Sequence, residues 1–453
     1  MITLVWPSVR HRLPSFITTF VAVFCSALVV GSFATLVETA TGPVSGADRQ
    51  TLVIMGAVIG GWGALIALFS LVSTLSVAVR RRYVEIGLLR TIGATPRQTR
   101  RLVRAETVLV AVVAALAGAG LAWPAGRALL DMLKGGGLVD DSVEFAGGFA
   151  AGGATVGLVV FTSVVAASIA GRRASRGPAR LALAEEAGTP ESSRWRIMAG
   201  LFLLACAGGS AAVTVFGTAD DADPYAAMQT SGSASIVAGV GLAALAPWLL
   251  RAGTNLARPL LDHSGVAGHL AAINTDRRTH LLGGVLGPII VFIAATTGTL
   301  MLVGIDSRTL VLPPNMTAAD ADMLTLLNTV VVGMIALFAA LMILNSLLAV
   351  MGDRKTEFTR IRLVGGTSGQ VQNVVLVETV LVSVVGVALG LVASLATIVP
   401  FALARKEGPV PDGQLWLPLA VSAFAVALTV VSGWVAVHQA NRVGSALDVA
   451  AAT

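Results

Sequence analysis

The sequence predicts an all-α polytopic membrane protein, and two features of its composition lead to that fold class. Hydrophobic residues make up 55% of the 453 residues and charged residues only 12%, whereas about a quarter of the residues in a soluble domain are charged. The apolar residues also form unbroken runs of roughly 20 residues, the length at which a helix spans a bilayer. Transmembrane β-strands would instead alternate apolar and polar residues.

Ten apolar runs are long enough to span a membrane. They cover residues 15–37, 52–79, 106–130, 149–170, 197–217, 230–250, 281–303, 324–350, 375–400 and 415–437. If both termini are cytoplasmic, the inner segments hold 25 of the 31 Lys and Arg residues, as the positive-inside rule requires. The Ala-, Val-, Gly- and Arg-rich composition is typical of a GC-rich bacterial genome. We therefore expect a multi-pass protein of the bacterial plasma membrane with both termini in the cytoplasm.

Other classes of protein fit the composition poorly. The net charge is +6, but the basic residues flank the apolar runs and no aromatic residues are interleaved with them. The sequence therefore predicts no nucleic-acid binding. Cys25 and Cys206 lie inside apolar runs, and the five histidines are scattered. Neither a disulfide framework nor a metal site is therefore expected.

A charged motif recurs in the sequence. The stretch between the second and third runs reads RRRYVEIGLLRTIGATPRQTRRLVRAETVLV, and much of it returns 272 positions later without a gap. The matching residues are Arg82, Glu85, Arg90, Gly93, Thr95 and Gln98 with Arg354, Glu357, Arg362, Gly365, Thr367 and Gln370. A basic loop needs positive charge but no particular residue order, so the recurrence indicates a duplicated bundle.

The duplication predicts how the chain is organised. Two four-helix modules are joined by a two-helix linker, and no outer loop is long enough for a large extracellular domain. The predicted domains are a cytoplasmic segment 1–14, a first module 15–185, a linker 186–255 and a second module 256–453.

The repeated motif predicts a helix, a tight turn and a second helix. Residues 80–89 continue the second span, with apolar positions at helical spacing. Gly93 permits a positive φ, Thr95 is the expected N-cap, and Pro96 suits the first helical position. Such a lever at the membrane surface is suited to docking another protein.

Four carboxylates of the motif have alternative interpretations. Glu85 and Glu357 either neutralise neighbouring arginines, which contributes about 0–1 kcal/mol at an exposed site, or fix the geometry of the lever. Glu106 and Glu378 begin the third and ninth spans, where capping of a helix N-terminus is a sufficient explanation and a distinct mechanistic role is the alternative.

The motif RxxxEIGLLRTIGATPRQ, followed by a basic helix and a glutamate, resembles the signature of FtsX-like or MacB-type permeases, the membrane subunits of type VII ABC transporters. The second copy is degraded to RKTEFTRIRLVGGTSGQ. The four-plus-two-plus-four layout is most similar to ten-span permeases of antimicrobial-peptide export and detoxification. The chain departs from the family because the seventh and eighth spans are separated by only about twenty residues, without the large outer domain of peptide-binding members.

The resemblance implies that the loop between the second and third spans contacts an ABC ATPase. Carried over residue by residue, the ATPase-coupling residues are Glu85, Leu88, Leu89, Arg90, Gly93, Thr95, Arg97, Glu357, Arg362, Gly365 and Thr367. The sequence lacks the GxxxxGK[ST] loop that cradles phosphates, so ATP and Mg would be bound by the partner ATPase, with no cofactor in this chain. Two modules in one chain predict two ATPase copies for each permease.

Three functions stay open from the sequence. The first is ATP-driven export or extraction of a hydrophobic or amphiphilic compound such as an antibiotic, antimicrobial peptide or lipid. The second is a signal transmitter that controls a cell-wall hydrolase or sensor kinase without moving a substrate. The third is gradient-driven transport, which typically needs intramembrane carboxylates or broken helices. Membrane lipid is an expected partner in all three, and an accessory extracellular or membrane protein is left open.

Overall fold

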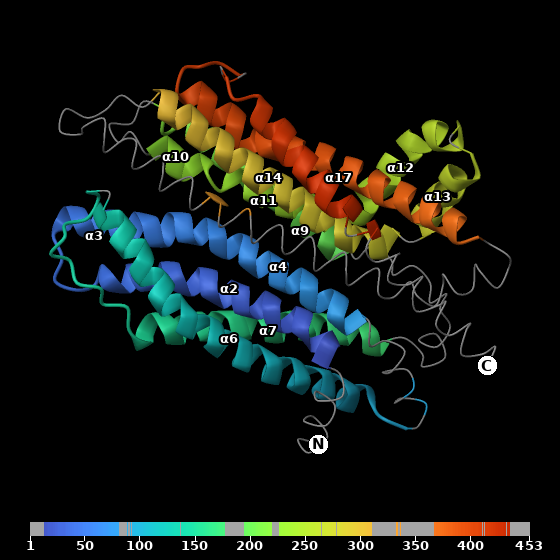
Figure 1. The fold of residues 1–453 in the computed structure, drawn as a ribbon, viewed down its shortest axis with the longest axis horizontal. Coiled ribbons are helices and arrows are strands. Elements are labelled where there is room, and N and C mark those ends of the chain that lie inside the picture. The colour runs from blue at the N-terminus through green and yellow to red at the C-terminus, as the bar shows by residue number, and fades with distance from the viewer. Residues whose placement is uncertain are drawn as a thin grey trace. The chain divides into compact units, whose positions relative to one another are not determined.

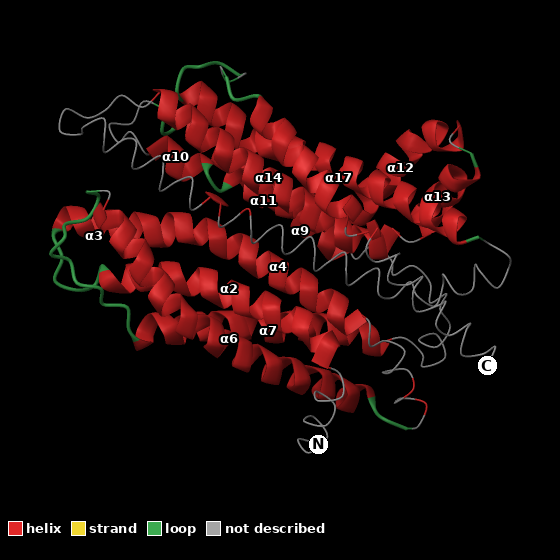
Figure 2. Ribbon diagram, in the orientation of Figure 1, coloured by secondary structure: helices red, strands yellow, loops and turns green. Residues whose placement is uncertain are grey.

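The structure is a computed structural model, and it describes a defined part of the chain. Within that part the secondary structure is helical without a β-strand (Figure 2). Among the described residues, seven helices are long and apolar enough to cross a membrane, or eight if one bent pair counts as a single span. The predicted all-α membrane fold is confirmed, whereas the number ten stays a prediction. The described residues are 13–80, 88, 91, 93–135, 137–176, 194–219, 226–263, 265–277, 279–309, 332–333, 336, 367–409, 411, 413–431 and 433–434.

The described helices form two compact units. In unit 1, α2 contacts α4, α6 and α7, and these four helices surround a common core (Figure 1). A short π-helical segment, η1, joins α3 to α4. The elements of unit 1 are α2 (Leu13–Thr39), α3 (Gly46–Val53), η1 (Ile54–Ile59), α4 (Gly60–Arg80), α6 (Pro96–Gly135) and α7 (Phe149–Arg176).

Small residues bring the helices of unit 1 together. A Cβ atom on Gly118 of α6 would lie 2.5 Å from the Phe24 carbonyl oxygen and 2.8 Å from the Ala27 Cβ atom of α2. A Cβ atom on Gly60 would lie 2.4 Å from that of Phe33, also on α2. Membrane helices gain packing contacts when small residues allow their backbones to approach closely.

Unit 2 contains a bundle built around α14. The helices predicted as a linker pack in this unit, because α11 contacts both α14 and α17. An apolar helix, Trp416–Val431, follows α17. The other elements are α9 (Arg194–Phe216), α10 (Ala226–Ser231), α11 (Ala234–Ala244), α12 (Ala246–His263), α13 (Val266–Arg277), α14 (Thr279–Thr309) and α17 (Ser368–Ala404).

The core of unit 2 combines close helix contacts with buried hydrogen bonds. A Cβ atom on Gly390 of α17 would lie 2.5 Å from the Ile293 Cβ atom of α14. The Ser235 amide donates to the Thr397 hydroxyl oxygen at 2.9 Å, and that hydroxyl donates to the Ser231 carbonyl oxygen at 2.7 Å. These bonds join α17 to the chain on both sides of the break between α10 and α11.

One predicted span differs in the structure. The run 230–250 is divided between helices, because Ala226–Ala244 and Ala246–His263 meet at an angle of 77°. In the last run, 415–437, the described residues include the helix Trp416–Val431. The run 324–350 falls almost wholly on residues outside the described part of the chain.

Candidate functional site

The first predicted coupling turn leads directly into α6. Gly93 has a φ of +101°, the left-handed conformation that glycine adopts without steric cost. The backbone amide of Gln98 donates to the Thr95 hydroxyl oxygen at 3.3 Å, and the backbone amide of Thr95 donates to the Gln98 side-chain oxygen at 2.8 Å. These reciprocal bonds form a capping box, which satisfies two donors at the helix start. The predicted turn glycine and N-cap are therefore confirmed.

The second copy of the motif has the same helix start. The backbone amide of Gln370 donates to the Thr367 hydroxyl oxygen at 3.3 Å, and the backbone amide of Thr367 donates to the Gln370 side-chain oxygen at 3.0 Å. This capping box begins α17 at Ser368. Two stretches of sequence with different flanking residues therefore produce one local geometry.

The described coupling residues all face outward. Leu88 is 53% exposed, and Gly93, Thr95, Arg97 and Thr367 are also exposed. Exposure leaves them accessible to a partner, and their role in docking an ATPase stays a prediction. The other predicted coupling residues, Glu85, Leu89, Arg90, Glu357, Arg362 and Gly365, lie outside the described residues.

The two predicted helix-start carboxylates lie deeper in their helices than expected. α6 begins at Pro96 and α17 at Ser368, so Glu106 and Glu378 each lie ten residues beyond the first helical position. The unpaired amides of a helix are confined to its first turn, and the interpretation as N-terminal caps is therefore wrong. Glu106 is 3% exposed and Glu378 is 2% exposed, so both carboxylates belong to the packed interior of their units.

Each capped turn is joined to the opposite end of its unit by one continuous helix. α6 contains 40 residues and α17 contains 37, which corresponds to lengths of about 60 Å and about 55 Å at 1.5 Å per residue. Both exceed the roughly 30 Å hydrocarbon core of a bilayer. Each helix is therefore long enough to cross the hydrocarbon core as one continuous element.

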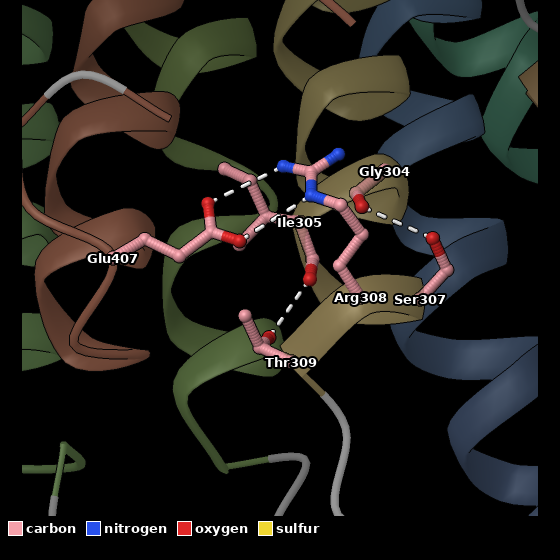
Figure 3. Close-up of polar contacts among 6 residues, drawn as sticks. All are labelled: Gly304, Ile305, Ser307, Arg308, Thr309 and Glu407. Carbon is pink, nitrogen blue, oxygen red and sulfur yellow. Dashed lines mark hydrogen bonds and ion pairs between the residues drawn. The ribbon is translucent and has the colours of Figure 1, made fainter. Parts of the chain in front are cut away.

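Ion pairs join the C-terminal ends of α14 and α17 in unit 2. Arg308 contacts Glu407 with an N–O distance of 3.3 Å, and both guanidinium bonds to that carboxylate are visible in Figure 3. Arg405 donates to Asp306, and both side chains are largely buried. Sequence reasoning missed this network, although its acidic and basic residues stand at the ends of two predicted spans.

Hydrogen bonds join the end of α2 to the start of α7 in unit 1. The Glu38 carboxylate, at the end of α2, accepts from the Gly148 amide at 3.0 Å and from the Ala151 amide at 2.8 Å. These donors belong to the first turn of α7, where a carboxylate is stabilised by unpaired amides and by the helix dipole. The Asp140 amide also donates to the Asp48 carboxylate at 3.1 Å, which links the loop after α6 to α3.

No arrangement for a metal is found in the part of the chain that the structure describes: no group of three or more His, Cys, Asp or Glu residues there is placed to hold an ion.

Comparison with known families gives two matches to one family model. The model is described as FtsX-like permease C-terminal, and it matches residues 57–175 and 329–443, together just over half of the chain. The chain belongs to the FtsX-like permease family. The two matches begin 272 positions apart, the same interval that separates the two copies of the motif. No curated protein matches the chain.

Membership of this family places the permease in a functional class. It is a membrane-embedded permease component of an ABC-type system, and FtsX-like permeases typically work with an ABC ATPase. In the structure, both family matches include a long capped helix, α6 in the first and α17 in the second.

Proposed function

We propose that the permease couples ATP hydrolysis by a separate ABC ATPase to the export or extraction of a hydrophobic or amphiphilic compound. The compound class includes antibiotics, antimicrobial peptides and lipids. Force passes from the ATPase to the outer side of the membrane through α6 and α17. The ATP and Mg are bound by the partner, and each permease chain engages two ATPase subunits through its two capped turns.

The continuity of α6 and α17 is the observation that carries this proposal. Each helix begins at an exposed capping box and ends at the outer end of its unit. The close contacts at Gly118 and Gly390 hold these rods against α2 and α14, so that neighbouring helices move with them. The buried Glu106 and Glu378 lie in the same rods.

The short outer loops favour a compound that reaches the permease through the bilayer. In unit 1 the Glu38 carboxylate of α2 binds the start of α7, and the Asp48 carboxylate of α3 binds the loop after α6. Only 17% of the most apolar stretch of α9 is buried, so this helix presents an apolar surface for lipid or a lipid-like substrate. MacB-type transport and the ten-span form are part of the proposal.

The first test is co-expression of the permease with an ABC ATPase, followed by co-purification and ATPase measurement in nanodiscs. The variants are Glu85→Ala/Glu357→Ala and Thr95→Ala/Thr367→Ala. Thr162→Ala is the matched control, because the Thr162 hydroxyl is exposed and bonds only to the Leu158 carbonyl of its own helix among the contacts identified. Loss of complex formation or of stimulated hydrolysis in both double variants, with the control unchanged, supports the docking role.

A second measurement separates transport from signalling. The complex is reconstituted in vesicles, and ATP-dependent movement of labelled amphiphilic peptides and lipids is followed. Movement that depends on the intact capped turns supports transport. Stimulated hydrolysis without movement of any tested compound favours the signal transmitter, whereas a chain that binds no ATPase overturns both ATP-driven functions.

A further inference from the structure

The helix α12 carries three different faces at helical spacing. Positions 250, 254, 257 and 261 face the bundle, and Leu250 and Thr254 are fully or almost fully buried. Positions 248, 252, 256 and 260 form an exposed apolar stripe, in which Trp248 is 65% exposed, Leu256 84% and Leu260 78%. Positions 251, 255, 258 and 262 form an exposed polar stripe with the sequence Arg, Asn, Arg, Asp.

Contacts with the bundle place α12 at the level where the membrane begins. Pro247 packs on α14 at Gly283, where a Cβ atom would lie 3.0 Å from the proline ring. Gly283 is the second residue of the apolar stretch Leu282–Thr309. Further along α12, Gly253 lies against Val385, the fourteenth residue of the apolar stretch Gln372–Ala404 of α17. The start of α12 therefore lies where the apolar stretch of α14 begins, and its middle lies beside the apolar stretch of α17.

The direction of α12 follows from the bend that precedes it. The apolar helices Ala226–Ala244 and Ala246–His263 meet at 77°, so a chain that crosses the bilayer before Leu245 runs nearly along its surface afterwards. Figure 1 shows α12 and α13 at one end of unit 2, and α13 contacts α17. At 18 residues, α12 is about 27 Å long.

We propose that α12 is an interfacial helix bound to the lipid of one bilayer leaflet. Its apolar stripe lies at the boundary between acyl chains and headgroups, where amphipathic helices bury one face. Trp248 stands at the membrane boundary, a position that tryptophan favours. Arg251 and Arg258 face the headgroups, where basic side chains are attracted to anionic lipids.

Nearby acidic groups offset the charge of α12, because Asp262 on the helix and Asp276 of α13 stand against Arg251 and Arg258. Arg251 contacts Asp276 of α13 with an N–O distance of 3.8 Å, and Asp262 contacts His269 at 2.9 Å. All four side chains are about half exposed, so water and headgroups reach them. These contacts also join α12 to α13, which keeps the apolar stripe in a fixed orientation.

The depth of the helix is tested with spin labels on the whole permease in nanodiscs that contain anionic phosphatidylglycerol. In a Cys25→Ala/Cys206→Ala background, Leu256→Cys places a label on the apolar stripe. The neighbouring Asn255→Cys places the matched control on the polar stripe. Collisions with oxygen, which concentrates in lipid, and with a nickel chelate, which stays in water, are measured for both. We expect oxygen to exceed nickel several-fold at position 256 and the reverse at position 255.

Two outcomes overturn the proposal. Equal and high nickel accessibility at both positions means that α12 lies in water. Low accessibility to both reagents at position 256 means that protein covers the stripe, which favours an ATPase or a second permease as its partner.

A second measurement uses the chain with its native cysteines. Quenching of tryptophan fluorescence by brominated lipids is compared between the wild type and Trp248→Phe, and the difference reports Trp248 among the seven tryptophans. We expect the lost fluorescence to be strongly quenched in the wild type. An unquenched Trp248 contradicts the interfacial position.

Discussion

The two units pack corresponding helices in one way but bury them to different extents. Gly118 of α6 touches α2 at Ala27, and Gly390 of α17 touches α14 at Ile293. Yet 94% of the most apolar stretch of α14 is buried, against 56% for α2. The difference arises because α11 and α12 also cover α14, with Gly239 of α11 packed on it. A shared helix contact therefore does not determine how much of a helix meets lipid.

The helix pairs α2–α6 and α14–α17 differ in the side chains at the ends opposite their capped turns. If the glycine contacts are aligned, Ala40 and Leu133 of unit 1 correspond to Asp306 and Arg405 of unit 2. The first two are apolar and at most 2% exposed, whereas the second two form an ion pair. One position is therefore held by apolar packing in unit 1 and by charge in unit 2.

The largest effect is expected from converting the unit 2 pair to the unit 1 residues one at a time. Arg405→Leu leaves the Asp306 carboxylate buried without its guanidinium, and we expect the free energy of unfolding to fall by about 3–5 kcal/mol. Asp306→Ala/Arg405→Leu removes both charges and should recover most of that loss. Unfolding in detergent micelles measures both variants, and additive losses would show that the pair is not coupled.

Replacing Gly118 and Gly390 with valine tests whether greater burial raises the cost of overfilling the shared helix contact. Gly118→Val and Gly390→Val both overfill a helix contact, at a cost of about 1–3 kcal/mol. We expect Gly390→Val to be the more damaging, because α14 is enclosed and has less freedom to shift. Thermal unfolding in nanodiscs measures the difference. Gly120→Val is the control, since nothing lies within 4 Å of a Cβ atom there, and equal losses at Gly118 and Gly390 would remove burial as the explanation.

The two capping boxes should respond alike, because both are exposed. Thr95→Ala and Thr367→Ala each remove one side-chain acceptor, and we expect each to destabilise its helix start by about 1 kcal/mol. Hydrogen exchange of the first turns of α6 and α17 measures the change. If only one of the two substitutions speeds exchange in its own helix turn, the caps are not equivalent. The control Thr162→Ala should leave the first turns of both helices protected.

The smallest effect on stability is expected when acid protonates Asp140 in the loop after α6 of unit 1. Hydrogen bonds from the Ser142 hydroxyl and amide, aided by Lys134, lower the pKa of Asp140 below its ordinary value of 3.8. A lowered pKa in the folded state means that this contribution is complete above the ordinary value and is lost as the pH falls through the folded value. NMR of the Ser142 amide should therefore stay constant from neutral pH to about 5 and change only in stronger acid. Asp140→Asn should abolish that change, and a transition near neutral pH would contradict the assignment.

Local features of the site could be predicted from the sequence. The Gly93 turn and the Thr95 cap depend on residues within a few positions of one another, so their chemistry is readable in the motif. The bend at Leu245 was missed, because the apolar run continues through it while the amphipathic pattern of α12 begins. The burial of Glu106 was misassigned, because a charged residue beside an apolar run is compatible with either a helix start or a helix interior.

The sequence by itself determined that the described chain is helical, that it suits a membrane and that one motif occurs twice. These properties follow from apolar run lengths, charge distribution and short-range hydrogen bonding. Only the tertiary structure decided that α14 is enclosed, that Arg405 meets Asp306, and that α12 leaves the direction of the helix before it. Those features depend on side-chain shape at contacts between distant parts of the chain, such as Ser235 with Thr397, and no local pattern encodes which distant residue will fill a given space.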